Sequence, residues 1–549
     1  MHLFAVVPIF TNVGVALLPT ILAALGSAVA ILFSPKALWK LCARRPWATC
    51  GIVGSIASCV VIAVWLFSNG NSTAAERSKL AAPPRYDWVR IAERIIAQEH
   101  AGRRPSSLAA TATSSSVVVD NPKPVDEKSK PAPIAGGESK PATEPVETKP
   151  PDNEPDRNSF PSHMQPLWSF QPEDTMFLGK AAAMGNRVYV AGSQADLGSF
   201  TGILACLDAE TGKPIWQVTQ LAGEPLPPFF SSPALAADGK RLIVGQGLHE
   251  DRNCSLLCFD TAGGQLIWSV KTPLHIESSP AVFGDLAVVG AGAIEGKNGK
   301  PEGDPGFVLA VRISDGKELW RYALNDPESS PAIDADGIVY IGSGFNGNAV
   351  VALRSQTDDE LAAKNLSRLV WRAQTPVPVT SPATLAGDLV LFGAGNSDVV
   401  HSQQNAQGMV VAIERKTGNI RWQKQFEDGV LGAIAVCGDK VACPVRTGEV
   451  VALSLENGQV VWHRAISGAA PVMAGCVCRE GKIAAVSSNG YLAILDAADG
   501  SVLEKCYLND QSKPGTGLSL ATPLVHDGKI IVGSETGGVR MLVGEHSSK

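Results

Sequence analysis

The stretch ACLDAETGKPIWQ, residues 205–217, joins a short apolar run to an acidic residue, a glycine turn and a tryptophan. Similar stretches follow: LLCFDTAGGQLIW (256–268), LAVRISDGKELW (309–320), VVAIERKTGNIRW (410–422) and VVALSLENGQVVW (450–462). A pattern that recurs at a near-constant period indicates a repeat architecture, in which each copy plays the same structural part. The repetition therefore favours an architectural role for these residues over a single catalytic site.

The number of repeats follows from the tryptophans, which recur at one position of the repeat. Successive members of the series are separated by 40 to 52 residues, and they are Trp168, Trp216, Trp268, Trp320, Trp371, Trp422 and Trp462. The next equivalent position holds Glu504, which makes eight units. Each unit also has a first half such as SSPAVFGDLAVVGAG (278–292), in which two β-prone runs flank a tight turn.

Four short antiparallel strands in about 45 residues are typical of one β-propeller blade. The last unit supplies only three strands, while the strand around Trp168 has no blade of its own, so we expect that strand to complete the final blade and close the ring. The predicted fold is all-β: an eight-bladed propeller of four-stranded antiparallel blades, with seven blades as the alternative.

The repeats resemble those of the PQQ-like, or quinoprotein-type, β-propeller family, whose consensus runs roughly Ala-x-Asp-x-x-Thr-Gly-x-x-x-Trp. The resemblance covers about residues 167–543 and implies that the seven tryptophans dock one blade onto the next. Such packing favours a small residue opposite each ring, and the sequence places there Cys206, Cys258, Ala310, Ala352, Ala412 and Ala452. In the unit with Glu504 this position is Ile494, so we expect a different contact at that junction.

The N-terminal 70 residues have the character of a membrane anchor. Two apolar segments, at about 13–33 and 48–67, are each long enough to cross a bilayer as a helix. The short loop between them is basic, which favours a cytoplasmic loop and places the propeller outside the inner membrane. A cleaved signal peptide is the alternative for the first segment.

Two further segments precede the propeller at 163–549. Residues 71–102 form a juxtamembrane segment, in which apolar residues at helical spacing predict a short amphipathic helix at 86–99. Residues 103–162 are rich in Pro, Lys and Glu, a composition typical of a disordered linker. The formal net charge of −6 gives no electrostatic basis for binding nucleic acid.

The family includes dehydrogenases that bind pyrroloquinoline quinone (PQQ) and calcium, with two adjacent cysteines over the quinone. This sequence has no Cys-Cys pair, and Cys476-Val-Cys478 is its nearest approach. The nine histidines match no paired motif, and no metal-ligand spacing occurs. We therefore expect no catalytic residues, no cofactor and no metal; PQQ with calcium is the alternative. A disulfide, for example between Cys254 and Cys258, is compatible with an extracytoplasmic location.

The connectivity of a four-stranded blade places the loop between its second and third strands on the same face as the segment that leads into its first strand. The long loops 194–201, 247–254, 291–306 and 395–408 all belong to this face. So do Glu277 and Ser278, and in the next blade Glu328 and Ser329, which we take as the candidate binding face. In the alternative interpretation, the Ser-Ser-Pro (SSP) segments that begin at Ser278 and Ser329 only cap the strands that follow them, and the two glutamates are solvated.

Resemblance to the non-catalytic branch of the family, which includes the outer-membrane-assembly propeller BamB, implies a binding or assembly scaffold, and the two apolar segments predict that it is anchored in the membrane. Its partners would be other envelope or membrane proteins. The alternatives are a membrane-bound PQQ-dependent alcohol or sugar dehydrogenase, and a module that binds a polysaccharide or a peptide.

Overall fold

The computed structural model describes residues 160–544, apart from 197–198, 250, 295–301 and 514. The predicted anchor and juxtamembrane helix, and all but the last three residues of the predicted linker, lie outside the described residues. No helix within the described part has the length and apolar character needed to span a bilayer.

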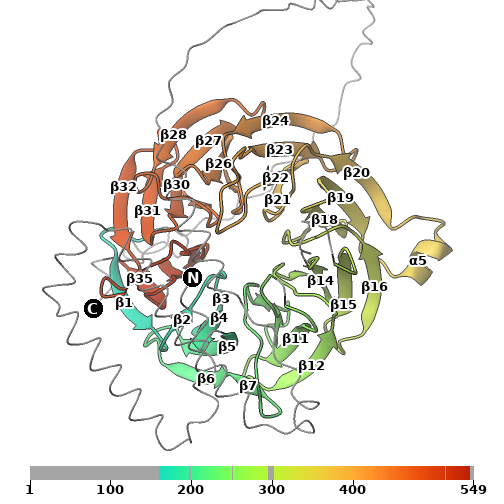
Figure 1. Cartoon of the computed structure of the whole chain (residues 1–549), viewed down its shortest axis with the longest axis horizontal. Coiled ribbons are helices and arrows are strands. Elements are labelled where there is room, and N and C mark those ends of the chain that lie inside the picture. Colours follow the sequence, from blue (N-terminus) through green and yellow to red (C-terminus); the bar gives the residue numbers. More distant parts are fainter. Residues whose placement is uncertain (1–159, 197–198, 250, 295–301, 514, 545–549) are drawn as a thin grey trace, which may run out of the picture. The chain divides into compact units, whose positions relative to one another are not determined.

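Eight antiparallel sheets follow one another around a ring, each with its first strand toward the centre and its last at the rim (Figure 1). Blade 1 has β3 (Ala182–Met184), β4 (Arg187–Asp196), β5 (Ser199–Asp208) and β6 (Pro214–Val218), and β2 (Thr175–Met176) also pairs with β4. Blade 2 has β9 (Ala234–Leu235), β10 (Arg241–Gly245), β11 (Ser255–Asp260) and β12 (Leu266–Lys271). Blade 3 has β13 (Ala281–Phe283), β14 (Leu286–Ala291), β15 (Phe307–Arg312) and β16 (Glu318–Ala323). Blade 4 has β17 (Ala332–Ile333), β18 (Ile338–Ser343), β19 (Ala349–Arg354) and β20 (Leu369–Gln374).

The second half of the ring repeats the same arrangement. Blade 5 has β21 (Thr384–Ala386), β22 (Leu389–Gly395), β23 (Gly408–Glu414) and β24 (Ile420–Phe426). Blade 6 has β25 (Ala435–Cys437), β26 (Lys440–Val445), β27 (Glu449–Ser454) and β28 (Val460–Ala465). Blade 7 has β29 (Val477–Arg479), β30 (Lys482–Val486), β31 (Tyr491–Asp496) and β32 (Val502–Tyr507). Blade 8 has β33 (Leu524–His526), β34 (Lys529–Gly533), β35 (Val539–Val543) and finally β1 (Gln165–Phe170).

The ring closes as the sequence predicted, because β1 pairs with β35 and Trp168 lies opposite Met541. Eight blades are confirmed, and the seven-bladed alternative is not needed. Two small elements decorate the ring: the hairpin β7 (Gln220–Leu221) and β8 (Glu224–Pro225), and the helix α5 (Asp358–Ala363), which projects between β19 and β20 (Figure 1).

The core lies between the blades. Middle strands such as β14 are buried along their whole length, whereas rim strands such as β12 alternate and bury chiefly the tryptophan. Apolar residues of neighbouring blades then form one cluster, as Ile243 and Trp268 of blade 2 do with Val289 and Leu309 of blade 3. The middle strands are apolar on both faces because each blade is packed between two neighbouring blades.

The seven tryptophans make the same contact at seven of the blade junctions. Each indole Nε1 donates a hydrogen bond of 2.7–3.1 Å to a backbone carbonyl of the following blade. The ring of Trp168 lies against Gly212, where an added Cβ would come within 2.5 Å of the indole. Gly212 also has a φ of +67°, which favours glycine. In ACLDAETGKPIWQ, the glycine thus receives the preceding blade's tryptophan, while Trp216 docks onto the next blade.

The junction between blades 7 and 8 uses Glu504 in place of a tryptophan. Glu504 lies opposite Ile494 in the ladder, and its carboxylate accepts hydrogen bonds from the backbone N–H groups of His163, at 2.9 Å, and Met164. The reason is topological: blade 8 joins its last two strands from opposite ends of the described chain, so it has no glycine turn to receive an indole. A carboxylate at this position can accept hydrogen bonds from the backbone N–H groups directly before β1.

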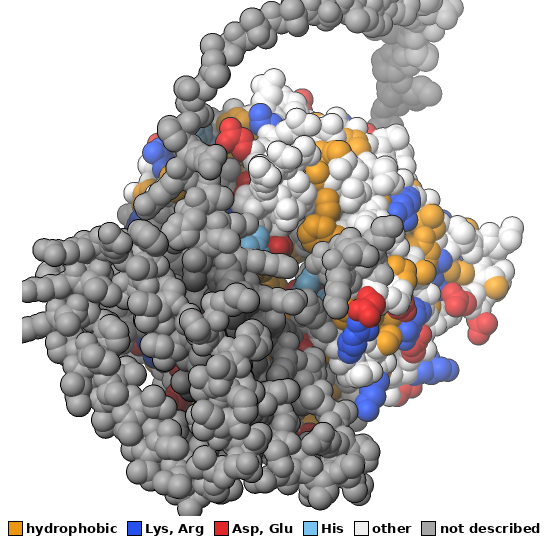
Figure 2. Space-filling view, in the orientation of Figure 1, with side chains coloured by type: hydrophobic (Ala, Val, Ile, Leu, Met, Phe, Trp, Pro, Cys, Tyr) orange, Lys and Arg blue, Asp and Glu red, His pale blue; other side chains and the backbone are white. Residues whose placement is uncertain are grey.

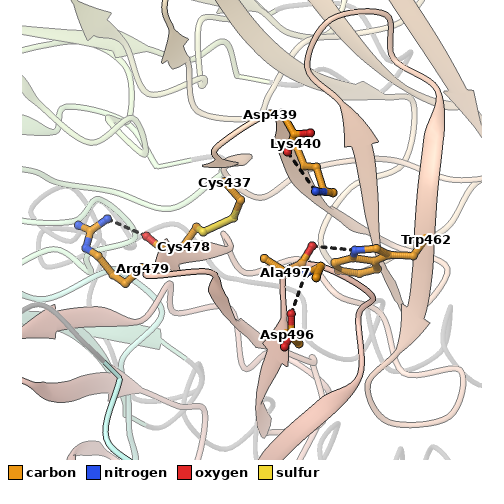
Figure 3. Close-up of a disulfide and its surroundings, with 9 residues drawn as sticks. Cys437, Asp439, Lys440, Trp462, Cys478, Arg479, Asp496 and Ala497 are labelled. Atoms are coloured by element: carbon orange, nitrogen blue, oxygen red, sulfur yellow. Dashed lines mark hydrogen bonds and ion pairs between the residues drawn. A yellow bond between two sulfur atoms is a disulfide. The ribbon is translucent and has the colours of Figure 1, made fainter.

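A disulfide joins Cys437 of β25 to Cys478 of β29, and so links the inner strands of blades 6 and 7 (Figure 3). The same view shows Trp462 donating its indole hydrogen bond to Ala497 of blade 7. The bridge considered from the sequence, between Cys254 and Cys258, is wrong, since both are buried free thiols. Cys258 lies opposite Trp268 in the ladder and serves as a small core residue there.

Candidate functional site

The two serines of the predicted binding face lie in the interior. Ser278 donates its hydroxyl hydrogen bond to the carbonyl of Ser329 at 3.0 Å, and Ser329 donates to the carbonyl of Ser381 at 2.7 Å. Ser278 and Ser329 have no exposed surface. These hydroxyls therefore link the SSP segments of successive blades, as the alternative interpretation proposed, and a ligand on the surface does not reach them.

The two glutamates of the predicted face have a different environment, because the ring brings both to the same pair of histidines. Oε1 of Glu328 lies 3.0 Å from Nδ1 of His249 and 3.1 Å from Nε2 of His275. Oε1 of Glu277 lies 3.9 Å from Nδ1 of His249. We call these four residues the His–Glu cluster. Figure 2 shows histidine side chains beside acidic ones near the middle of the face that it views.

Three connections from neighbouring parts of the ring build the cluster. His249 lies in the loop between β10 and β11, while His275 and Glu277 lie in the connection from β12 to β13. Glu328 lies one blade further on, between β16 and β17. No sequence motif links the two histidines, but the fold brings them together, with their ring centroids 5.4 Å apart. The available signal was local, since His275-x-Glu277 places both side chains on one side of an extended segment.

Backbone contacts hold the cluster in place. The carboxylate of Asp326, two residues before Glu328, accepts hydrogen bonds from the backbone N–H groups of Ala293 and Phe345 at 2.8 and 2.9 Å. At Gly292 an added Cβ would lie 2.4 Å from Nε2 of His275, so only glycine leaves room for this ring. The His275 side chain is fully buried, and its Nδ1 has no hydrogen-bond partner among the described residues.

The cluster concentrates negative charge. Burial and the nearby Glu328 carboxylate raise the pKa of Glu277, and they raise the pKa of Asp326 to about 7. Burial opposes ionisation of Glu328 too, but the adjacent His249 charge and hydrogen bonds from both histidines hold its pKa well below its usual range. The Glu328 charge in turn raises the pKa of His249. Among the residues that the structure describes, no Lys or Arg forms an ion pair with these three carboxylates.

One donor atom each from His249, His275 and Glu277 lie within 4.8 Å of one another, so these residues could hold a metal ion. The sequence led us to expect no metal ligands, and this donor set was missed because its members come from separate connections.

The residues do not fit the quinone site that the family resemblance raised as an alternative. Cys478 is bonded to Cys437 of the neighbouring blade, and Cys476 is a buried free thiol. The two therefore cannot supply the paired cysteines of that site.

Eight blades, with tryptophans at seven of their junctions, define the chain as a β-propeller of the quinoprotein-repeat class. Residues 165–403 and 406–547 match the family described as "Outer membrane protein assembly factor BamB", and the chain belongs to this family.

Individual relatives are distant. BamB of Yersinia pestis is 22% identical over 398 residues, which cover 69% of this chain and 84% of the relative. The dehydrogenase subunit of a quinone alcohol dehydrogenase from Gluconobacter oxydans is 27% identical over 294 residues, which cover 47% of this chain but only 35% of the relative. The crystal structure of BamB from Moraxella catarrhalis has a TM-score of 0.51 at 15% identity, and covers 71% of this chain and all of that one. At this identity the structural likeness shows the fold alone.

Proposed function

We propose that this protein is a non-catalytic scaffold of the cell envelope, anchored in the inner membrane by its N-terminal segments, with the propeller outside the cytoplasm as a protein-binding platform. The observation that carries the proposal is the family match along nearly the whole propeller, to proteins named for outer membrane protein assembly. The misfit of Cys476 and Cys478 to a quinone site supports a binding role over dehydrogenase chemistry.

The face that carries the long loops is the proposed contact surface. The tight turns of the opposite face hold strand ends together, whereas the loops between second and third strands vary in length and sequence. Val400 lies in one such loop with 41% of its surface exposed. Toward the opposite face Phe283, the last residue of β13 before its tight turn, is 39% exposed and offers a matched apolar position.

Photocrosslinking can test this surface. A photoreactive amino acid at position 400 of the full chain, in the cells that produce it, is expected to give adducts with specific envelope proteins. The same residue at position 283 should give none. Equal adducts from both positions, or adducts from 283 alone, would contradict the assignment of the binding face.

The topology requires a separate test. Protease added to intact spheroplasts is expected to remove the propeller while the membrane segments stay behind. Full protection of the propeller, with degradation only after lysis, would place it in the cytoplasm and overturn the proposal.

The quinone dehydrogenase relatives support one alternative, a PQQ-dependent oxidoreductase. We expect purified protein with added PQQ and Ca²⁺ to show no dye-linked oxidation of alcohols or sugars. Turnover that depends on added PQQ would favour the enzyme over the scaffold.

A further inference from the structure

The His–Glu cluster has the spacing of a metal-binding shell. Four ligands at about 2.0–2.1 Å from a tetrahedral zinc ion stand about 3.3 Å from one another. In the structure Oε1 of Glu328 lies 3.0 Å from Nδ1 of His249 and 3.1 Å from Nε2 of His275, and Oε1 of Glu277 lies 3.9 Å from Nδ1 of His249. One donor atom each of His249, His275 and Glu277 lie within 4.8 Å of one another, so a small shift of these side chains brings them to the separation that the ion requires. We propose that the cluster binds one divalent transition-metal ion of the zinc type, with His249, His275 and Glu277 as ligands and Glu328 completing the shell.

Charge balance supports the ion. Glu277 and Glu328 have only 14% and 11% of their side chains exposed, and the buried Asp326 lies two residues from Glu328. Among the described residues, the imidazoles of His249 and His275 are the only basic side chains that pair with Glu277 and Glu328. Buried charges are costly unless they are paired or coordinate a metal. A dication coordinated by Glu277 and Glu328 would give both of these enclosed carboxylates an opposite charge at short range.

The cluster is both rigid and accessible. The His275 ring is enclosed, and its backbone is tied to Gly292, whose N–H donates to the His275 carbonyl at 3.2 Å. The His249 side chain, by contrast, is 43% exposed and lies at the solvent side of the cluster. An ion can thus enter past His249 and meet three side chains that the fold already holds close together.

The donor types select the class of metal. Two imidazole nitrogens with carboxylate oxygens suit zinc and its transition-metal neighbours, whereas calcium and magnesium require oxygen ligands alone. This inference is independent of the proposed scaffold function. The ion would join a loop of blade 2 to the connections that follow blades 2 and 3, and would stabilise the face that carries the long loops.

The test uses the full chain, purified without a histidine tag and freed of metal with a chelator. Zinc titration with elemental analysis is expected to give one tightly bound Zn²⁺ per chain, and Co²⁺ is expected to give the intense visible absorption of a tetrahedral site. His249→Ala and Glu277→Gln should each lower the affinity for Zn²⁺ by at least about tenfold. Loss of a residue that only supports a metal ligand already lowers metal affinity by about 10- to 100-fold. Glu277 approaches His249, which is the exposed member of the cluster. Circular dichroism will verify the fold of each variant.

His463→Ala is the matched control. Nδ1 of His463 lies 2.9 Å from Oε1 of Glu449 at an exposed surface, so this pair has the same chemistry but only two donors. The control is expected to bind Zn²⁺ as the wild type does. Absence of tight binding in the wild type, or equal binding by the folded His249→Ala and Glu277→Gln variants, would overturn the proposal. A weak octahedral Co²⁺ spectrum would overturn the four-ligand shell.

Discussion

Replacement of Glu504 by alanine should loosen the closure of the ring. The Glu504 carboxylate receives two backbone hydrogen bonds, from His163 and Met164, directly before β1. A buried hydrogen bond to a charged group contributes about 1.5–3 kcal/mol, and partial exposure here reduces this to about 1 kcal/mol for each bond. The expected loss is therefore about 2 kcal/mol in the free energy of opening β1, or roughly a 30-fold larger open population.

Hydrogen exchange followed by mass spectrometry measures this opening directly. Peptides that cover β1 should exchange about 30-fold faster in Glu504→Ala than in the wild type, by the same conversion. Glu504→Gln should lie between the two, because the amide keeps an acceptor oxygen but loses the charge. Glu318→Ala is the control, since the Glu318 carboxylate pairs with Arg321 on the exposed side of β16 and should leave β1 unchanged. If β1 in Glu504→Ala exchanges at the wild-type rate, the carboxylate does not hold the closing strand.

Three further predictions concern the blade junctions. Trp422→Phe keeps an aromatic ring but removes the 2.8 Å hydrogen bond to the Leu455 carbonyl. Urea titration should therefore show a free energy of unfolding lower by about 1–2 kcal/mol. An unchanged midpoint would mean that the bond contributes nothing to stability. Replacing Cys437 and Cys478 together by alanine removes a link across 41 residues and should lower the unfolding free energy by about 2–4 kcal/mol, measured by denaturant titration under non-reducing conditions. Burial raises the pKa of Cys476 to about 12, so the thiol stays protonated at pH 8. We expect iodoacetamide to modify Cys476 only after the chain is unfolded. Rapid labelling of Cys476 in the native chain, detected by peptide mapping, would contradict this burial.

The glycine–tryptophan repeat was sufficient to predict the fold. The spacing of the tryptophans gave the number of blades, and the unpaired strand around Trp168 gave the closure. Even the exception was visible in the sequence, since Glu504 breaks the pattern at the one junction where the next blade has no glycine turn. These features are predictable because each depends on a local pattern repeated along the chain.

The candidate site was predictable only in part. Glu277 and Glu328 were found because they precede equivalent SSP segments. His249 has no motif in common with them, and the position of His275 two residues before Glu277 was the one local signal. The disulfide was missed for the same reason, because Cys437 and Cys478 occupy inner strands of different blades.

The sequence by itself determined the propeller, its number of blades and the docking by an indole at seven of the eight junctions, because burial of a large ring against a glycine turn is a local demand that recurs along the chain. Only the tertiary structure decided that two histidines and two glutamates from three connections meet in one cluster. Their meeting depends on how each blade is rotated relative to the next, which follows from the packing of the whole ring and has no signature at any one position in the chain.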